Sequence, residues 1–271
     1  MKTILFTNAR DENNILEWVV HHLNLGFSHI FIFDHKSNIP IRDTLRNIST
    51  TMVTVQNRET IVKKDLIYEA HVYAIQNSFD WMLYLDTDEF LILNFVNNVV
   101  DFLIDYKEYD QVGINWLMFG TNYLDTFPGG TLLENYTRCD TALNKHIKSF
   151  ININLVSNIS MVNCYCAHML FLKNMTNSVN VDYELFDTNE PYFHTPILSV
   201  QCVKAYVAHF LYQAYEIYMT RKVFRPRDDI PNTYRDQVSA ECLHSRHNTH
   251  VNTFPMEKYN QKNRLEIEKY K

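Results

Sequence analysis

The chain has 271 residues, of which 46% are hydrophobic and 14% aromatic, and its formal net charge is −6. This apolar content is enough for a large core, and an α/β domain often reaches about 250 residues as one unit. A nucleic-acid-binding protein normally carries a basic excess, because much of its affinity comes from neutralising phosphates. The acidic balance therefore argues against nucleic acid as the partner.

The sequence also argues against a membrane span, which needs about 20 consecutive apolar residues. The longest apolar runs, Trp81–Leu85 and Phe90–Leu93, are short and flanked by charge. The N-terminal residues lack a small-residue cleavage site and become acidic at Asp11-Glu12, which is typical of a first strand and not of a signal peptide. We therefore expect no membrane span and a cytoplasmic location, for a cytosolic enzyme or an excised domain.

Predicted strands and helices alternate through the first third of the chain. Strands are predicted at Lys2–Thr7, His29–Phe33, Met52–Val55 and Trp81–Leu85. The first helix carries apolar residues at helical spacing from Ile15 to Leu23 and is ended by Gly26, and a second is predicted at Asp65–Gln76. Such alternation predicts an α/β fold with a doubly wound, mainly parallel sheet.

Polar clusters follow three of these predicted strands. They are Asn8–Glu12, Asp34–Asn38 and Asp86–Glu89. In doubly wound sheets, ligands bind in the crevice beyond the carboxyl ends of the strands. The three clusters are therefore expected to meet in one crevice.

The pattern is looser after Glu89. Further strands are predicted at Val112–Trp116 and Lys204–His209, and a helix at Gln213–Lys222. Prolines and charges dominate from Arg225 onward, and the end is predicted to be a polar helix or a frayed tail. We predict a catalytic domain over residues 1–225, with 226–271 as a polar extension that packs on it or trails from it.

Asp86 and Asp88 directly follow an apolar strand. At a strand end, these two side chains point the same way while Thr87 points opposite. Two adjacent carboxylates repel each other and need a compensating cation. Hard oxygen ligands suit Mg²⁺ or Mn²⁺, and substrate phosphates commonly complete the coordination of such ions.

The segment Trp81-x-x-x-x-Asp86-x-Asp88-Glu89-Phe90 resembles the core motif of family-2-like and family-92-like glycosyltransferases. Other stretches are similar to further motifs of these families and follow in the right order. They are Asn14–Ile30 with Glu17-Trp18, Phe33–Ser37, Asn115–Asn122, Leu133–Arg138, Lys148-Ser149, His168 and His209-Phe210. Together these matches span most of residues 1–225.

The resemblance implies a fold of the type called GT-A, whose mainly parallel sheet has a smaller antiparallel portion. It also implies a uridine diphosphate (UDP) sugar donor and Mn²⁺ or Mg²⁺. The implied donor-binding residues are Asn8, Arg10, Glu12, Asp34, Asp86 and Thr87, with Lys222 or Arg225 supplying charge. The implied metal site is formed by Asp88, which binds the ion directly, by His209, and by Asp86, which lies nearer the ribose or supports the direct ligands. His209 lies in an alternating aromatic stretch, where a histidine is as often a hydrogen-bonded core residue.

The sugar or acceptor pocket is expected at Trp116, Phe119, Gly120, Asn122 and His168, because aromatic faces pack against pyranose rings. An inverting transferase also needs a carboxylate base for the acceptor hydroxyl. Asp182 and Glu134 are the two candidates for this base.

Two positions depart from the family pattern. Asp11 stands where the family has asparagine, and Gln213-Ala214 replaces a Lys-Ser pair. The missing lysine weakens any phosphate contact from that position, and Lys222 or Arg225 would have to supply the charge.

The predicted function is transfer of a hexose from a nucleoside-diphosphate donor to a hydroxyl of a glycan or glycoconjugate. The resemblance favours inversion, and galactose over glucose, N-acetylglucosamine or rhamnose. Two alternatives stay open: a metal-dependent nucleotidyltransferase or phosphatase, and a non-catalytic protein that uses a degenerate donor site to bind glycans or a partner.

Overall fold

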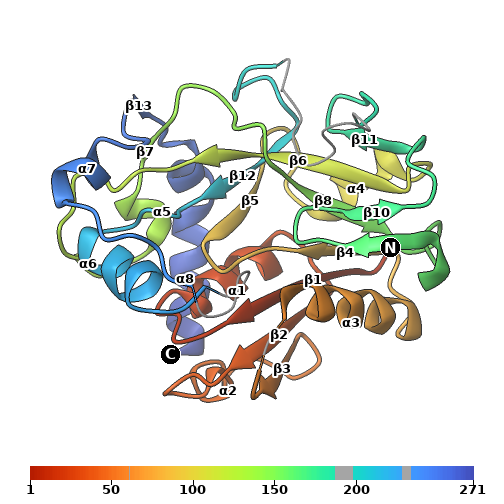
Figure 1. Ribbon diagram of the computed structural model, residues 1–271, viewed down its shortest axis with the longest axis horizontal. Coiled ribbons are helices and arrows are strands. Elements are labelled where there is room, and N and C mark those ends of the chain that lie inside the picture. Colours follow the sequence, from red (N-terminus) through yellow and green to blue (C-terminus); the bar gives the residue numbers. More distant parts are fainter. Residues whose placement is uncertain (61, 187–197, 228–232) are drawn as a thin grey trace.

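A computed structural model describes residues 1–60, 62–186, 198–227 and 233–271. Its central element is a curled sheet of nine strands in the order β3-β2-β1-β4-β8-β6-β12-β5, with β11 paired to β6 (Figure 1). The strands are β1 Thr3–Ala9, β2 His29–His35, β3 Val53–Arg58, β4 Trp81–Tyr84, β5 Glu89–Leu93, β6 Gln111–Met118, β8 Ile147–Asn152, β11 Ser178–Asn180 and β12 Ala205–His209. Two small antiparallel pairs join β9 (Val162–Tyr165) to β10 (Leu170–Leu172) and β7 (Arg138–Cys139) to β13 (His250–Val251).

The N-terminal half of the sheet is parallel, as its apolar runs predict. β1 pairs in parallel with both β2 and β4, and β2 pairs in parallel with β3. All seven residues of β1 and all four of β4 are buried, which fits strands that are covered on both faces. The other half is mixed, because β8 runs antiparallel to β4 and β6, and β5 runs antiparallel to β12.

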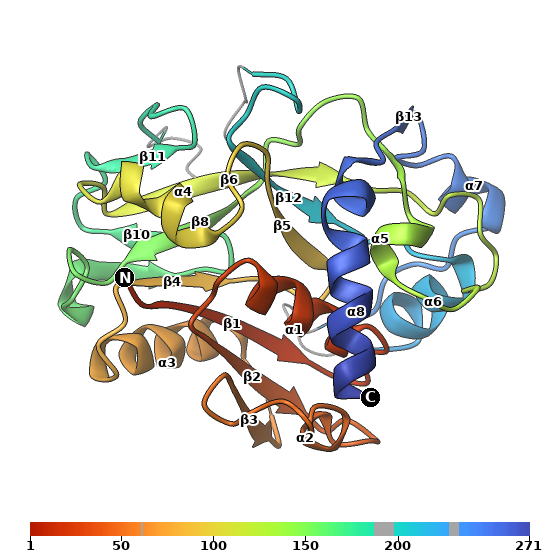
Figure 2. The same ribbon diagram turned by 180° about the vertical axis from the view of Figure 1, so that it is seen from behind.

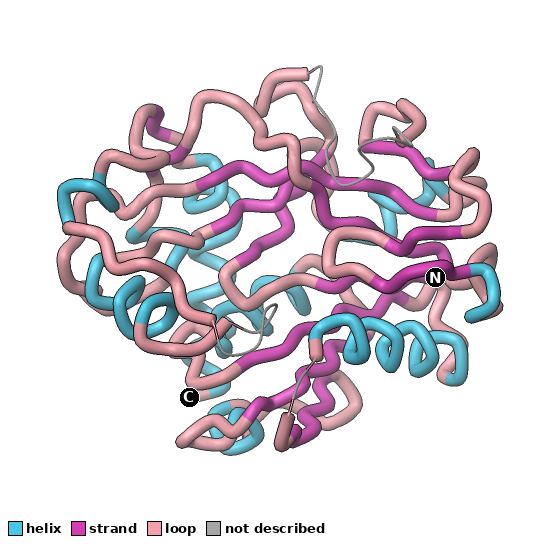
Figure 3. The backbone as a smooth tube through the Cα atoms, in the orientation of Figure 1, coloured by secondary structure: helices cyan, strands magenta, loops and turns pink. Residues whose placement is uncertain are grey.

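Helices cover both faces of the sheet (Figures 2 and 3). The longer ones are α1 Ile15–Asn24, α3 Lys63–Gln76 and α8 Gln261–Tyr270, and the shorter ones are α2 Ile41–Thr44, α4 Val99–Leu103, α5 Leu132–Asn135, α6 Tyr215–Tyr218 and α7 Ala240–His244. Single 3-10 turns lie at η1 Ile104–Tyr106 and η2 Ile159–Met161, and π turns at η3 Met219–Val223 and η4 Met256–Asn260. The apolar side chains of α1 and α4 pack into one core, and those of α3 pack into a second core on the opposite face.

The architecture confirms the predicted α/β class, with a mixed, largely parallel sheet. The expected helix at Gln213–Lys222 is shorter and irregular, because α6 passes directly into the π turn η3. Within the described residues, no helix has the length and apolar character needed to cross a membrane.

The C-terminal extension packs on the rest of the chain where it is described, and residues 228–232 lie outside the described part. Helix α8 lies along α1 (Figure 2). Asn263 is buried and hydrogen-bonds to Nδ1 of His21 at 3.2 Å. The Tyr259 hydroxyl contacts the backbone of Leu93 in β5. The extension therefore shares contacts with both α1 and the central sheet.

Candidate functional site

A cavity of about 700 Å³ opens beyond the carboxyl ends of β1 and β4. This volume lies within the range of small-molecule and cofactor pockets. Its described lining is Asn8, Arg10, Glu12, Val62, Lys63, Lys64, Asp86, Thr87, Asp88, Trp116, Lys148, Cys164, Tyr165, Cys166, Ala167, His168, His209, Leu211, Arg221, Lys222, Arg225, Pro226, Arg227 and Arg235. Two of the three predicted polar clusters, after β1 and after β4, thus meet in one crevice.

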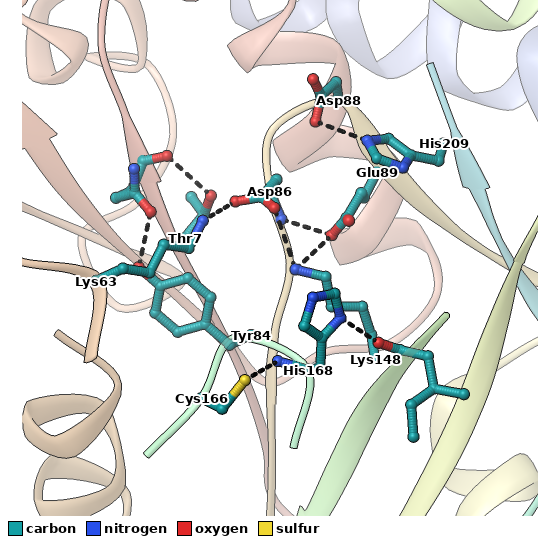
Figure 4. Close-up of polar contacts among 12 residues, drawn as sticks. Thr7, Lys63, Tyr84, Asp86, Asp88, Glu89, Lys148, Cys166, His168 and His209 are labelled. Atoms are coloured by element: carbon teal, nitrogen blue, oxygen red, sulfur yellow. Dashed lines mark hydrogen bonds and ion pairs between the residues drawn. The ribbon is translucent and has the colours of Figure 1, made fainter. Parts of the chain in front are cut away.

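Asp86 lies between two lysines from distant parts of the chain (Figure 4). One carboxylate oxygen contacts the Lys63 ammonium, and the other lies 3.1 Å from Nζ of Lys148. Its backbone N–H donates to Oε2 of Glu89 at 2.8 Å, which holds the turn after β4. Burial tends to raise the pKa of Asp86, but Lys148 and Lys63 hold that pKa well below its ordinary value. Asp86 is therefore a paired anion.

Asp88 is buried and lies beside a second group of basic side chains, Lys222, Arg221 and His209. An oxygen of Asp88 lies 2.7 Å from Nζ of Lys222 and 3.7 Å from the Arg221 guanidinium. The other oxygen lies 3.7 Å from Nε2 of His209. Burial opposes the charge on Asp88, yet Lys222, His209 and Arg221 together lower its pKa below the ordinary value. Asp88 is thus an anion held on the cavity wall.

Glu89 and Lys148 form a buried pair, in which Lys148 lines the cavity (Figure 4). Their side chains are 0% and 1% exposed, and the ammonium lies 3.2 Å from Oε2 of Glu89. Burial raises the pKa of Glu89 to about 8, although Lys148 acts in the opposite direction. Oε1 of Glu89 has no hydrogen-bond partner among the described residues. Lys148 therefore contacts both Glu89 and Asp86.

The predicted metal ligands fit a divalent cation only in part. Burial lowers the pKa of His209 to about 4, so its imidazole is neutral at pH 7, and its Nδ1 has no hydrogen-bond partner among the described residues. Asp88 and His209 together offer an oxygen and a nitrogen that suit Mn²⁺ or Mg²⁺. Both oxygens of Asp86, in contrast, contact lysines.

The three predicted ligands do not form one metal-binding cluster. The described residues contain no group of three or more His, Cys, Asp or Glu side chains placed to hold a metal ion. The repulsion expected between Asp86 and Asp88 is instead offset by lysines of the chain itself. Phosphate oxygens of a substrate would have to complete any coordination at Asp88 and His209.

The donor-binding residues predicted after β1 line the cavity. Oδ1 of Asn8 accepts a hydrogen bond from the Tyr84 hydroxyl at 3.0 Å, at the base of the crevice. Glu12 forms an ion pair with Arg221 at 2.6 Å. Arg225 donates to the backbone carbonyl of Arg10 at 2.7 Å. These contacts join the loop after β1 to the segment around η3.

Two predicted donor-binding residues differ in their placement. Thr87 is buried and lines the cavity, and its carbonyl accepts a hydrogen bond from the Asn14 side chain at 2.7 Å. Asp34 does not line the cavity. Its carboxylate accepts the backbone N–H groups of Ser37 and Ile41, so it holds the loop between β2 and α2.

Trp116 and His168, two residues of the predicted sugar or acceptor pocket, line the cavity. The Trp116 ring stacks on His146, with centroids 5.0 Å apart and planes at 14°, and also contacts His168 and His209. Nδ1 of His168 lies 2.8 Å from the carbonyl of Ile147. Burial lowers the pKa of His168 to about 4, so the rings of this cluster that face the cavity are uncharged at neutral pH.

Phe119, Gly120 and Asn122 do not line this cavity, and each has a packing role instead. Phe119 is buried and packs on Phe210. A Cβ added to Gly120 would lie 2.5 Å from both Oδ1 of Asn248 and the carbonyl of His247, so this position allows close backbone packing. Asn122 has φ of +52° and accepts the N–H groups of residues 137 and 138.

The two candidate bases also lie outside the cavity lining. Asp182 follows β11, where burial and Glu184 raise its pKa. Glu134 accepts the backbone N–H of Thr131 as part of the N-terminal cap of α5, and it contacts Arg264 at 3.1 Å. The structure therefore places neither carboxylate beside Asp88.

Sequence reasoning gave no role to Lys63 or Lys148, although both contact Asp86. Lys148 belongs to a matched Lys-Ser pair within a strand whose other residues are mostly apolar. A lysine in a buried strand indicates a charged partner, because an unpaired buried charge is very costly. The identity of that partner could not be predicted, since Asp86 is 62 residues away.

The fold and site define an α/β protein with a crevice of about 700 Å³ at the carboxyl ends of its parallel strands, whose described lining is mainly basic among its charged residues. The family model of glycosyltransferase family 92 matches residues 1–193. The chain belongs to this family, and the family is one of transferases.

Comparison with individual proteins gives weaker similarities. No curated protein sequence matches the chain. The crystal structure of S. aureus TarS 1–349 matches with a TM-score of 0.40 and 11% identity, over 59% of this chain and 50% of that one. The same protein in complex with UDP-GlcNAc matches with a TM-score of 0.39 and 14% identity, over 65% and 51%. The chain thus spans about half the length of these TarS structures.

A further similar structure is a putative glucose-1-phosphate thymidylyltransferase from Bacillus anthracis in complex with a sucrose. It matches with a TM-score of 0.34 and 9% identity, over 59% of this chain and 74% of that one.

Proposed function

We propose that the chain transfers a hexose from a UDP-sugar to a hydroxyl group of a glycan or glycoconjugate, with inversion at the anomeric carbon. Membership of glycosyltransferase family 92 supports the reaction class. The observation that carries the donor assignment is the pair of cations beside Asp88, Arg221 and Lys222, with Arg225 in the same cavity lining. Guanidinium and ammonium groups are the side chains that suit a diphosphate.

In this proposal, the acceptor hydroxyl oxygen forms a bond to the anomeric carbon of the donor sugar. The bond from that carbon to the phosphate oxygen breaks, UDP leaves with the bonding electrons, and the hydroxyl proton passes to a base. Arg221 and Lys222 stabilise the negative charge that develops on the departing diphosphate. Trp116 offers an aromatic face to the sugar ring.

Asp88 and His209 are the residues that would hold Mn²⁺ or Mg²⁺, and Asp86 would stay paired with its two lysines. A bound divalent ion would neutralise charge on the diphosphate as a Lewis acid. The neutral imidazole of His209 suits metal binding, because a protonated ring has no lone pair to donate.

The test substitutes Asp88 by asparagine and measures UDP binding by calorimetry with Mn²⁺ and with EDTA. We expect Asp88→Asn to abolish transfer and to lower UDP affinity in Mn²⁺ by at least tenfold, because the variant loses the anion that faces the metal and Lys222. The exposed Asp43→Asn in α2 is the matched control and should bind UDP normally. Wild-type UDP affinity that is equal in Mn²⁺ and EDTA would contradict the metal assignment.

A panel of UDP-sugars separates catalysis from a purely binding role. A ligand that binds only the folded state raises the thermal midpoint, so the preferred donor should give the largest shift. UDP-galactose, UDP-glucose and UDP-N-acetylglucosamine are the probes, and UDP release in Mn²⁺ reports turnover. A thermal shift without any UDP release would favour the non-catalytic alternative. The anomeric configuration of the product, read by NMR, tests inversion.

A further inference from the structure

The cavity lining is strongly basic although the chain as a whole is acidic. Among the described residues that line it, nine are lysine or arginine and three are aspartate or glutamate. The whole chain, in contrast, has 25 basic and 31 acidic residues. A cleft lined by one sign of charge concentrates ligands of the opposite sign.

The cations deepest in the cavity are already paired. Lys63 and Lys148 contact Asp86, and Lys222 contacts Asp88. These ion pairs account for the two aspartates of the turn after β4. They do not account for the other basic residues of the lining.

Three lining cations have no carboxylate within ion-pair distance among the described residues: Arg10, Lys64 and Arg235. Arg10 follows β1 and belongs with the donor-binding loop. Lys64 is exposed in the first turn of α3, and Arg235 is half-buried in the segment that follows η3. Lys64 and Arg235 therefore come from two separate elements that border the same cavity.

A donor does not account for all of this charge. A diphosphate that carries a divalent cation is close to neutral, so it leaves most of the basic excess uncompensated. A neutral acceptor would also leave it uncompensated. A negatively charged group on the acceptor would offset it and would gain charge-assisted hydrogen bonds.

We propose that the acceptor carries a phosphate or carboxylate group, and that Lys64 and Arg235 bind that group. This inference rests on the proposed glycosyl transfer, and it narrows the acceptor from any glycan to an anionic one. Lys64 and Arg235 are specificity-determining residues in this assignment, and the carbohydrate hydroxyl that reacts would lie nearer Trp116.

The experiment uses the whole chain saturated with UDP and Mn²⁺, so that the donor site is filled. Glucose, glucuronate and glucose 6-phosphate are titrated into this complex by calorimetry. The three probes share one ring and differ in charge. We expect both anionic sugars to bind at least about fivefold more tightly than glucose. We expect this preference to shrink as the salt concentration rises, because rim charges are screened.

Lys64→Gln and Arg235→Gln test the two residues directly. Each substitution should reduce the preference for the anionic sugars over glucose by about threefold to fivefold. The affinity for the sugar phosphate should fall, and the affinity for UDP should stay unchanged. Arg46→Gln, an exposed arginine outside the cavity, is the control and should retain the full preference.

The outcomes separate this inference from the proposed function. Equal binding of the three sugars, or binding by none of them, overturns the inference while UDP binding stands. If Lys64→Gln and Arg235→Gln weaken UDP itself, these cations serve the donor and the inference is also overturned. Failure of UDP to bind the wild-type chain would instead overturn the proposed function.

Discussion

Glu89 is an acid whose burial makes the stability of the fold depend on pH. Its pKa is about 8 in the folded chain, against 4.5 for an ordinary glutamate. The contribution of the protonated form is therefore complete below about pH 4.5 and is lost as the pH rises toward 8. Glu17, on α1, has a pKa raised by burial to the same value and acts in the same direction.

We predict that Glu89→Gln flattens this pH dependence. The free energy of unfolding of the wild-type chain should fall between pH 5 and 8. In the variant this decrease should be smaller, by an amount on the order of a few kcal/mol. Urea unfolding at several pH values measures the effect. Glu241→Gln, at an exposed position in α7, should follow the wild-type curve. Parallel curves for Glu89→Gln and wild type would mean that Lys148 keeps Glu89 ionised.

The sequence allows the residues of the crevice to be predicted where they immediately follow apolar strands. Asn8 and Asp88 are of this kind, because a strand end has a defined place in a parallel sheet. Lys148 could not be placed in the same way, since its partner Asp86 is reached only when β8 inserts beside β4. Asp34 follows a strand too, but backbone N–H groups occupy its carboxylate.

At the scale of elements, the segment after β6 illustrates how a sequence motif can serve packing. Gly120 donates its N–H to the carbonyl of Arg138, and the chain near Asn248 leaves no room for a side chain there. We predict that Gly120→Ala destabilises the fold by about 1–3 kcal/mol, because atoms must shift to admit the methyl group. Thermal unfolding measures the loss.

The same variant distinguishes packing from ligand binding. UDP affinity of folded Gly120→Ala should equal that of the wild-type chain, since residue 120 does not line the cavity. If the variant has normal stability but binds a sugar or UDP more weakly, Gly120 belongs to the sugar or acceptor pocket, as its motif predicted.

The strands β1 to β4 of the parallel half were predicted, as were β6 and β12, whereas β8 was not. β1, β2 and β4 are continuous apolar runs between helices, which is the pattern of buried parallel strands. β8 contains Lys148, Ser149 and Asn152 although all its residues are buried, so its composition conceals its position in the sheet. Buried polar groups with specific partners override simple hydrophobic patterning.

At the scale of the whole molecule, the described part of the C-terminal extension is tied to the rest of the fold. Ile267 in α8 is 8% exposed, whereas Leu265 in the same helix is 62% exposed. We predict that Ile267→Ala lowers the free energy of unfolding by about 2–3 kcal/mol, and that Leu265→Ala changes it by less than about 0.5 kcal/mol. Chemical denaturation of both variants measures the difference. Equal effects would indicate a tail that trails from the domain.

The uneven placement of charge has a consequence for how fast ligands arrive. The described part of the cavity lining carries nine basic and three acidic side chains, whereas the whole chain carries 25 basic and 31 acidic ones. A basic crevice in an acidic chain is expected to attract a diffusing anion. Association rates of anionic ligands should fall steeply with ionic strength, and those of uncharged sugars should not. The crevice should therefore select anionic ligands through their association rates, before they contact Asp88.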